Sequence, residues 1–522
     1  MKSGRTGKLT KLMLNIVFVF AIAFLAVLLI MQVNHSVTFD EADRVVFIPQ
    51  KAGFVALRFA LILFVLMLSK RIRLTVSKKM FYGLSIAYVL LNVCLVFMLS
   101  LQPTDDQYYM TSIASNMIRG GCDEFEPYGY MNLYPFQYSF MRYVKFVFTL
   151  LGTDNYYALQ VLNVLYLWLI IYFIVKNTRF MFGREQYQIG VILMLFLPLS
   201  FLVTYIYGSL LSLALSLASA YYLLRFLTGE GRQWINFLLV AALNTLAILA
   251  KNNALIFTVA EICILFLFSV KQAEKKAVLR NVLLVAAILA VYALSITAVN
   301  RSLAKYTGDD KVGTPKIAWV AMGLQTGGAV EGWFNNYNAR VYWDNDCDTE
   351  KAAALSRAAI RESIYGFLRD PKYCVKFFYK KICAEWMNPS FGSFYKIQRM
   401  TVYHPNTEIR YSLPARWFLH RSPGKTLDAT HSILNEYLRI YELAIFAGAF
   451  LYLVIRRLRV TDSLFIIVFI GGFLFHVFWE AACQYMLPYF VMLIPYGVMG
   501  LTDFRDIVAA RIKHLKIARD PV

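Results

Sequence analysis

Two adjacent carboxylates, Asp105 and Asp106, stand where an apolar run ends, in the stretch PTDDQYYMTSIASNMIRGG at 103–121. The run before them, at 80–101, is long enough to cross a bilayer, so we expect both side chains at the level of the lipid headgroups. A carboxylate in that place can take a proton from a hydroxyl group, which is general-base chemistry. One carboxylate can also cap the helix that follows, but two exceed what capping needs. We therefore take Asp105 and Asp106 as candidate catalytic residues.

The residues after Asp106 have the spacing of a short helix. Ile113, Ala114, Met117 and Gly120 follow it by 7, 8, 11 and 14 positions, which is helical periodicity closed by a glycine. We expect this helix to lie along the membrane, with its amino end at the carboxylates.

The elements that must position these residues are membrane spans. Hydrophobic residues make up 59% of the 522-residue chain and charged residues only 16%, against roughly 25% in soluble domains. Runs long enough to cross a hydrocarbon core of about 30 Å recur along the sequence. We read twelve of them, at 13–33, 52–69, 79–101, 156–176, 187–206, 208–226, 234–250, 253–271, 280–300, 438–455, 462–480 and 484–502. The fold class predicted is an all-α polytopic membrane protein.

The formal charge of +21 follows this topology and does not indicate nucleic acid binding. With the amino terminus inside, both tails and five inter-span loops fall on one side of the membrane. These segments hold 26 Lys and Arg but 7 Asp and Glu, so they carry +19 of the charge. This positive-inside pattern predicts a cell-membrane protein with both termini cytoplasmic. No cleavage site of small residues follows the first apolar run, which we therefore expect to be a retained anchor.

Two long outer segments interrupt the alternation of spans and short loops. We divide the chain into an amino-terminal transmembrane module at 1–300, with its catalytic outer loop at 102–155, an extracytoplasmic loop domain at 301–437, and a carboxy-terminal part at 438–522. The last part comprises transmembrane helices and a basic cytoplasmic tail. No internal repeat or flexible linker stands out.

The loop domain at 301–437 is expected to be folded and to carry amphipathic helices. Asp348 or Thr349 can cap a helix through 349–368, because a short polar side chain satisfies free backbone amides. Pro371 stands at a favoured first-turn position of a second helix. The aromatic residues and lysines of that helix alternate as in a helix lying on a membrane surface.

The pattern D-Q-Y-Y-x(3)-I-A-x-x-M-x-x-G, which begins at Asp106, resembles the first outer loop of the GT-C superfamily. These membrane glycosyltransferases use polyprenyl-phosphate sugars and include dolichyl-phosphate-mannose mannosyltransferases and aminoarabinose transferase-like enzymes. The acidic residue there is the general base on the acceptor, so the resemblance implies this role for Asp106, with Asp105 in reserve. Many relatives have Asp-Glu where this chain has Asp-Gln, which leaves the choice between the two open.

Three further segments resemble the same superfamily. PYGYMNLYPFQ at 127–137 is similar to the aromatic, proline-rich end of the catalytic loop. NTLAILAKNNALIFTVA at 244–260 is similar to its mid-chain helices, with a lysine at the outer turn between two spans. WEAACQYMLPYF at 479–490 is similar to a late Glu-x(3)-Arg-Tyr-x-x-Pro pattern, with glutamine where arginine is common. These three segments and the short helix after Asp106 supply seven predicted substrate-binding residues: Tyr109, Tyr134, Gln137, Lys251, Glu480, Gln484 and Tyr485. Two more are Arg142 and Trp333, whose ring can stack on a sugar.

The implied reaction is an inverting sugar transfer at the outer membrane face. A carboxylate deprotonates the acceptor hydroxyl as it attacks, and cations neutralise the departing phosphate. Lys251 suits the second role, because a lysine at headgroup depth pairs with a phosphate while its stem stays in apolar surroundings. Arg142, Lys145, Lys380 and Lys381 are weaker candidates, since headgroup anchoring explains them more readily. No cofactor is implied; the partners are the lipid-linked donor, a glycan, glycolipid or protein acceptor, and the bilayer.

Other polar clusters are weaker candidates for a functional site. FDEADR at 39–44 holds a second acid pair, but too little chain follows it before the next span to build a groove. WDNDCDTE at 343–350 alternates carboxylates like a calcium loop, yet lacks its glycine and final glutamate. No metal site is predicted, although a loosely held divalent cation stays compatible. Glu261 lies within a span, where a catalytic and a hydrogen-bonded structural role both remain open. The cysteines outside the spans permit either thiols or disulfides: Cys122, Cys347, Cys374 and Cys383.

Two other functional classes fit a chain of this kind. A transporter or flippase of lipid-linked glycans would need ionisable residues along a path through several spans, and only Arg58 and Glu261 lie well inside one. A glycan polymerase or ligase also combines many spans with a large outer loop. That mechanism would rely on outer arginine and histidine residues and would leave the DDQYY segment without a task.

Overall fold

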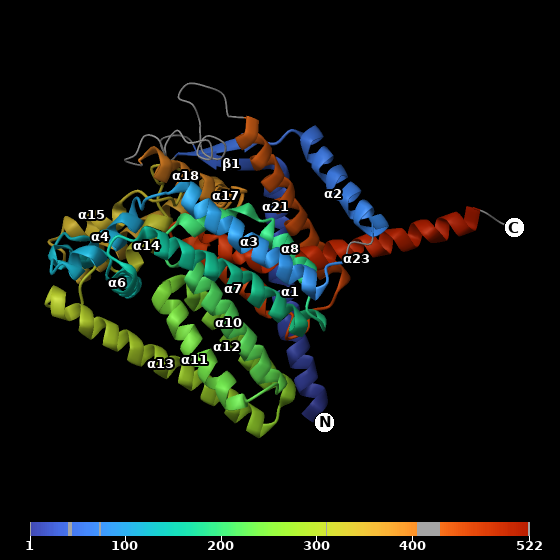
Figure 1. Ribbon diagram of the computed structural model, residues 1–522, viewed down its shortest axis with the longest axis horizontal. Coiled ribbons are helices and arrows are strands. Elements are labelled where there is room, and N and C mark those ends of the chain that lie inside the picture. Colours follow the sequence, from blue (N-terminus) through green and yellow to red (C-terminus); the bar gives the residue numbers. More distant parts are fainter. Residues whose placement is uncertain (1, 40–43, 73–74, 310, 404–428, 520–522) are drawn as a thin grey trace.

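The computed structural model of the protein describes residues 2–39, 44–72, 75–309, 311–403 and 429–519 (Figure 1). Almost all of this part of the chain is helical. The α-helices are α1 (Lys2–Asn34), α2 (Ala52–Ile72), α3 (Lys78–Leu99), α4 (Asp106–Ile118), α5 (Tyr130–Leu133), α6 (Tyr138–Leu151), α7 (Tyr156–Phe182), α8 (Tyr187–Met194), α9 (Leu197–Phe201), α10 (Ser209–Thr228), α11 (Gln233–Ala250), α12 (Leu255–Gln272), α13 (Lys275–Thr307), α14 (Ile317–Gly323), α15 (Tyr337–Trp343), α16 (Thr349–Arg369), α17 (Pro371–Trp386), α18 (Ser393–Val402), α21 (Ala429–Ile455), α22 (Leu464–Phe478) and α23 (Leu487–Arg519). Short 3₁₀ helices are η1 (Asp123–Phe125), η2 (Pro135–Gln137), η3 (Leu202–Thr204), η4 (Asn252–Ala254) and η5 (Cys483–Tyr485).

Ten helices of the described residues are long and apolar enough to cross a membrane. They are α1, α2, α3, α7, α10, α11, α12, α13, α21 and α23, and they coincide with ten of the twelve predicted spans. The prediction of an all-α, multi-pass membrane protein is therefore confirmed at this level.

The other two predicted spans have a different form. The stretch 187–206 is broken into α8 and the pair α9–η3, which are bent by 61°. Pro198 stands in the first turn of α9, where its missing N–H fits the start of a new helix and not the continuation of α8. The stretch 462–480 contains only the 15 residues of α22, about 22 Å at 1.5 Å per residue. Beyond Phe478 the backbone is extended.

One antiparallel hairpin follows α1 and was not predicted. Its strands β1 (His35–Phe39) and β2 (Val45–Pro49) pair in register, with His35 opposite Pro49. It is fastened to the end of α17, because the Val37 amide donates to the Met387 carbonyl at 2.8 Å. In β1, HSVTF, polar and apolar residues alternate as in a strand, but so short a run does not by itself distinguish a strand from a loop. The acid pair of FDEADR, at 40–41, lies outside the described residues.

The helices predicted in the outer segments are present. Asp348 caps α16, accepting from the amides of Glu350 and Lys351 at 2.9 Å, and Pro371 begins α17. The carboxy-terminal half of α17, from Phe377 onward, is largely buried against protein, so this half does not lie on a membrane surface as predicted. The described residues, which include all seven cysteines, contain no disulfide bond.

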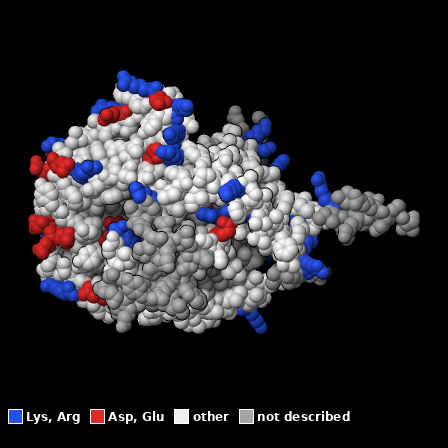
Figure 2. Space-filling model, turned by 90° about the horizontal axis from the view of Figure 1, so that it is seen from above, with Lys and Arg blue, Asp and Glu red and all other residues white. Residues whose placement is uncertain are grey.

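The basic inter-span loops meet at one end of the bundle. Ion pairs join α2 to α23 through Lys70 and Asp506 at 3.7 Å, and α7 to the loop after α10 through Arg179 and Glu230 at 3.2 Å. In the view of Figure 2, acidic side chains gather at the opposite end, while Lys and Arg predominate near the projecting α23. The charge asymmetry expected from the sequence is therefore a property of the folded molecule.

Candidate active site

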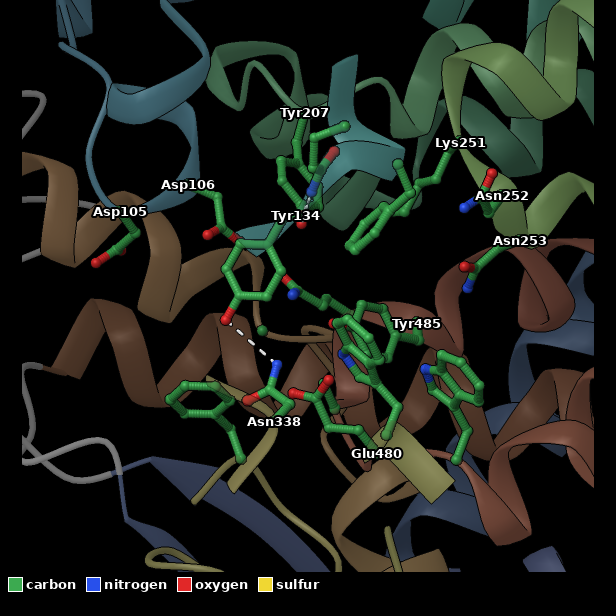
Figure 3. Close-up of a pocket in the computed structure, with 18 of the residues that line it drawn as sticks. Asp105, Asp106, Tyr134, Tyr207, Lys251, Asn252, Asn253, Asn338, Glu480 and Tyr485 are labelled. Atoms are coloured by element: carbon green, nitrogen blue, oxygen red, sulfur yellow. Dashed lines mark hydrogen bonds between the residues drawn. The ribbon is translucent and has the colours of Figure 1, made fainter. Parts of the chain in front are cut away.

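A cavity of about 580 Å³ opens where several parts of the chain meet (Figure 3). Its walls come from the loop around α4 and α5, the turn between α11 and α12, the segments around α14 and α15, the start of α18, and the end of α22 with the chain that follows it. Phe39 of β1 and Tyr207, before α10, complete the lining. Ten of the eleven predicted site residues line it: Asp105, Asp106, Tyr109, Tyr134, Gln137, Lys251, Trp333, Glu480, Gln484 and Tyr485.

Asp105 precedes α4 in a backbone conformation that glycine favours, with φ 54° and ψ −136°. Such a conformation costs a non-glycine residue of the order of 1–3 kcal/mol and persists only where surrounding contacts hold it. Here the carboxylate pairs with Arg399 of α18 at 2.8 Å. Its side chain makes no capping hydrogen bond to α4, so the structural role considered for it from the sequence is wrong.

Asp106 is the first residue of α4, where the helix dipole favours a negative charge. Its Oδ1 accepts a hydrogen bond from the Tyr130 hydroxyl at 3.0 Å. Burial, and then the charge of Asp106, raise the pKa of Tyr130 well above its ordinary value, so this hydroxyl stays a donor. The Tyr130 ring stacks on Tyr109, with centroids 4.5 Å apart. No described residue donates to Oδ2 of Asp106, which leaves that oxygen for a ligand.

Lys251 stands in the extended turn between α11 and η4, on the other side of the cavity from Asp106 (Figure 3). Its Nζ donates to Ser209 Oγ at 2.7 Å and lies 4.5 Å from the Tyr207 ring centroid and 5.6 Å from that of Tyr485. Among the described residues it has no carboxylate in an ion pair. Burial lowers the pKa of Lys251 to about 7, while the charge of Asp106 acts in the opposite direction. An anion in the cavity would restore the ammonium form.

The chain after α22 lines the cavity in an extended conformation. A hydrogen bond from the Ala481 amide to the Gly332 carbonyl, at 2.8 Å, stabilises this conformation. Glu480 faces the cavity, and burial, reinforced by the charge of Asp106, raises its pKa to about 8. At pH 7 it is mostly protonated and can donate a hydrogen bond. Gln484 Oε1 is buried without a partner among the described residues, so it can accept one from a ligand.

Aromatic side chains form much of the remaining wall. Trp319 and Trp479 stack with centroids 5.9 Å apart and planes at 4°. The Tyr134 hydroxyl accepts from Asn338 Nδ2 at 3.2 Å. Together with Trp333, these groups make a concave surface with a few fixed polar atoms, as in sites for small organic ligands.

Four predicted cations lie elsewhere. Arg142 is exposed on α6, donates to Ser302 at 3.4 Å and does not line the cavity. Lys145, one turn further along α6, is not a lining residue either. Lys380 pairs with Glu331 at 2.7 Å. Lys381 is fully buried and donates to the carbonyls of Gly323 and Trp479, each at 2.6 Å, so it secures backbone and does not anchor a headgroup.

The cavity also contains residues that the sequence did not single out. Lys396 and Arg399 come from α18, and Lys396 lies 5.6 Å from the Tyr205 ring centroid. Asn252 and Asn253 follow Lys251 directly, and their position beside a candidate residue was the one signal that could have identified them. The lysine and arginine of α18 had no such signal.

The described residues contain no group of three or more His, Cys, Asp or Glu placed to hold a metal ion. Comparisons of the chain with protein-family models, curated proteins and solved structures find no match.

Proposed function

We propose that this protein is a GT-C-type membrane glycosyltransferase, which moves a sugar from a polyprenyl-phosphate carrier to an acceptor hydroxyl at the extracytoplasmic face. One observation carries the proposal. Two groups face the same aromatic cavity: Asp106 has an oxygen that accepts no hydrogen bond from a described residue, and Lys251 has no carboxylate partner among those residues. That arrangement offers a base for one substrate and a cation for the other.

The reaction follows from these two groups. The acceptor hydroxyl gives its proton to Asp106 while its oxygen forms a bond to the anomeric carbon of the donor sugar. The bond between that carbon and the phosphate oxygen breaks, and the lipid phosphate leaves with the electron pair. Lys251 stabilises the charge that develops on the phosphate. Attack from the face opposite the leaving group inverts the anomeric centre, and no metal is required.

The location is inferred from the charge distribution. The cavity lies away from the loops that carry most of the positive charge, and those loops belong on the cytoplasmic side by the positive-inside rule. The cavity therefore opens outside, where the polyprenyl-linked donor would lie in the outer leaflet. Leu255 and Ile256 of α12 supply apolar wall beside Lys251 for the start of the lipid chain.

The test is sugar transfer in reconstituted vesicles from a labelled polyprenyl-phosphate sugar. We expect Asp106→Asn to lower kcat by about 10²- to 10⁴-fold, the usual contribution of a general base. Asp105→Asn should have a smaller effect, because that carboxylate is held by Arg399. Asp123→Asn, on the same outer loop but exposed and outside the cavity, is the matched control. Unchanged transfer in Asp106→Asn would remove the proposed base.

No specific observation favours the transporter. Its two candidate intramembrane ionisable residues are engaged in structural contacts: Arg58 is bonded to both carboxylate oxygens of Glu436, and Glu261 accepts from Ser219 at 2.9 Å and Asn244 at 2.7 Å. The same vesicles also test this alternative and the polymerase or ligase. Transfer that persists in both aspartate variants, or no transfer by the wild type with any donor, would favour one of them.

A further inference from the structure

The turn between α16 and α17 projects apolar side chains that no described part of the chain covers. We call residues 361–376 the hairpin tip. Tyr365, Leu368 and Val375 are 67%, 71% and 72% exposed, and Ile364 is 46% exposed. Ile364, Tyr365 and Leu368 follow one another at helical spacing and form one stripe on α16. A soluble surface scatters such residues singly, whereas a continuous stripe marks a contact with another apolar phase.

The charges around this stripe are mainly positive. The hairpin tip contains Arg361, Arg369, Lys372 and Lys376, and among the described residues none of them is in an ion pair. Of its two acidic residues, Asp370 is engaged as the cap of α17, accepting from the Tyr373 amide at 2.9 Å. Exposed apolar residues flanked by unpaired cations are typical of helices that lie in a membrane interface.

The base of the hairpin places the tip beside the bilayer. On α17, Phe378 contacts Phe478, with ring centroids 6.5 Å apart. Phe478 is the last residue of the apolar helix α22, and it and Leu474 are exposed on the outside of the bundle. These side chains face lipid in a membrane-spanning bundle, so the apolar surface of α22 continues onto α17. The ion pair between Lys380 and Glu331, at 2.7 Å, holds this part of α17 in place.

We infer that the hairpin tip inserts its apolar stripe into the outer leaflet and that its four cations bind anionic lipid headgroups. The cations provide the charge complementarity to such headgroups. The apolar surface of α22 continues onto α17 and so connects the hairpin tip with the lipid-facing surface of the bundle. The inference does not depend on the proposed sugar transfer.

The experiment places a polarity-sensitive fluorophore on Leu368→Cys, in a background where the five cysteines that are not fully buried are serine: Cys94, Cys122, Cys263, Cys347 and Cys374. Lys351→Cys, exposed at the start of α16, is the control. The protein is placed in vesicles of phosphatidylcholine, alone or with an equal amount of phosphatidylglycerol. Lipids with a shallow spin label should quench the fluorophore at 368 severalfold more than that at 351, and more strongly with phosphatidylglycerol.

Equal quenching at 368 and 351, or none at either, would overturn the inference. A fluorophore at position 368 that reports apolar surroundings in native membranes but in neither kind of vesicle would also overturn the inference, because that result means a protein partner. A second measurement uses the native cysteines. Replacing Arg361, Arg369, Lys372 and Lys376 with Gln should at least halve the phosphatidylglycerol that the purified protein retains, and unchanged retention would also contradict the inference.

Discussion

Asp105 and Asp106 are neighbours in the chain but have different contacts. The positive φ at Asp105 turns the backbone so that its carboxylate meets Arg399, while that of Asp106 meets Tyr130. Asp106 keeps one oxygen that no described residue occupies. The choice that the sequence left open therefore has a physical basis in favour of Asp106, which the transfer assay tests.

Lys251 makes a prediction about pH. Its pKa is lowered by burial to about 7, so the ammonium form in the empty site is lost as the pH rises through that value. Since a phosphate binds the ammonium form, donor affinity in the wild type should fall above about pH 7, by at most about tenfold per pH unit for one linked proton. Arginine stays protonated, so Lys251→Arg should flatten the profile. The measurement is KM for the lipid-linked donor across this range.

The controls for Lys251 separate charge from position. Lys251→Gln should bind the donor weakly at every pH. Lys305→Gln, exposed at the end of α13 and outside the cavity, should keep the wild-type profile. A profile shared by the wild type and Lys251→Arg would show that another group controls the pH dependence.

Much of the cavity could be predicted from local signals. Carboxylates after an apolar run and a lysine at a turn between two runs are visible in the sequence, and the structure brings Asp106 and Lys251 to one cavity. Lys396 and Arg399 were missed because α18 reaches the cavity only through long-range packing, which no periodicity reports. Arg142 is close in sequence to the catalytic loop, but its side chain is bonded to α13.

At the scale of elements, hydropathy predicted the spans that are continuous helices and failed where something interrupts them. Pro198 starts a new helix inside one predicted span, and α22 ends early because its following residues form the cavity wall. In both of these spans the local composition stays apolar while the backbone changes, so composition alone could not reveal the change. The β1–β2 hairpin was missed for a different reason, because a few alternating residues beside charged ones also fit a loop between spans.

The contact between α21 and α23 depends on glycines that hydropathy cannot evaluate. A Cβ at Gly448 would lie 2.2 Å from the Gly497 carbonyl oxygen, and one at Gly500 would lie 1.9 Å from that of Gly448. Backbone atoms cannot swing aside, so the helices would have to separate. Gly448→Ala and Gly500→Ala should each cost about 1–3 kcal/mol, the usual range for overpacking.

Thermal unfolding in detergent measures this cost. Both variants should lower Tm by several degrees. Gly83→Ala is the matched control, because nothing lies within 4 Å of the position of its Cβ on α3. A Tm loss in the control equal to that in Gly500→Ala would assign the effect to the helix backbone instead of the contact.

The whole molecule combines a short helix with a recessed site. At about 22 Å, α22 is shorter than the hydrocarbon core, and the chain that follows it forms part of the cavity wall. Glu480 and Tyr485 are therefore expected below the level at which the neighbouring spans end. This depth would bring the site to the phosphate of a lipid-linked donor without extracting its chain from the bilayer.

The topology depends on whether α22 and the broken pair of α8 and α9 each cross. If both do, the chain crosses twelve times and its two ends share one side, which the positive-inside pattern makes cytoplasmic. A fluorescent protein fused after α23 should then fluoresce, and alkaline phosphatase fused there should be inactive. Phosphatase fused after Thr307, at the end of α13, should be active. Activity at both positions would mean that α22 fails to cross. Activity after α23 alone would mean either that the broken pair of α8 and α9 fails to cross or that the orientation is reversed.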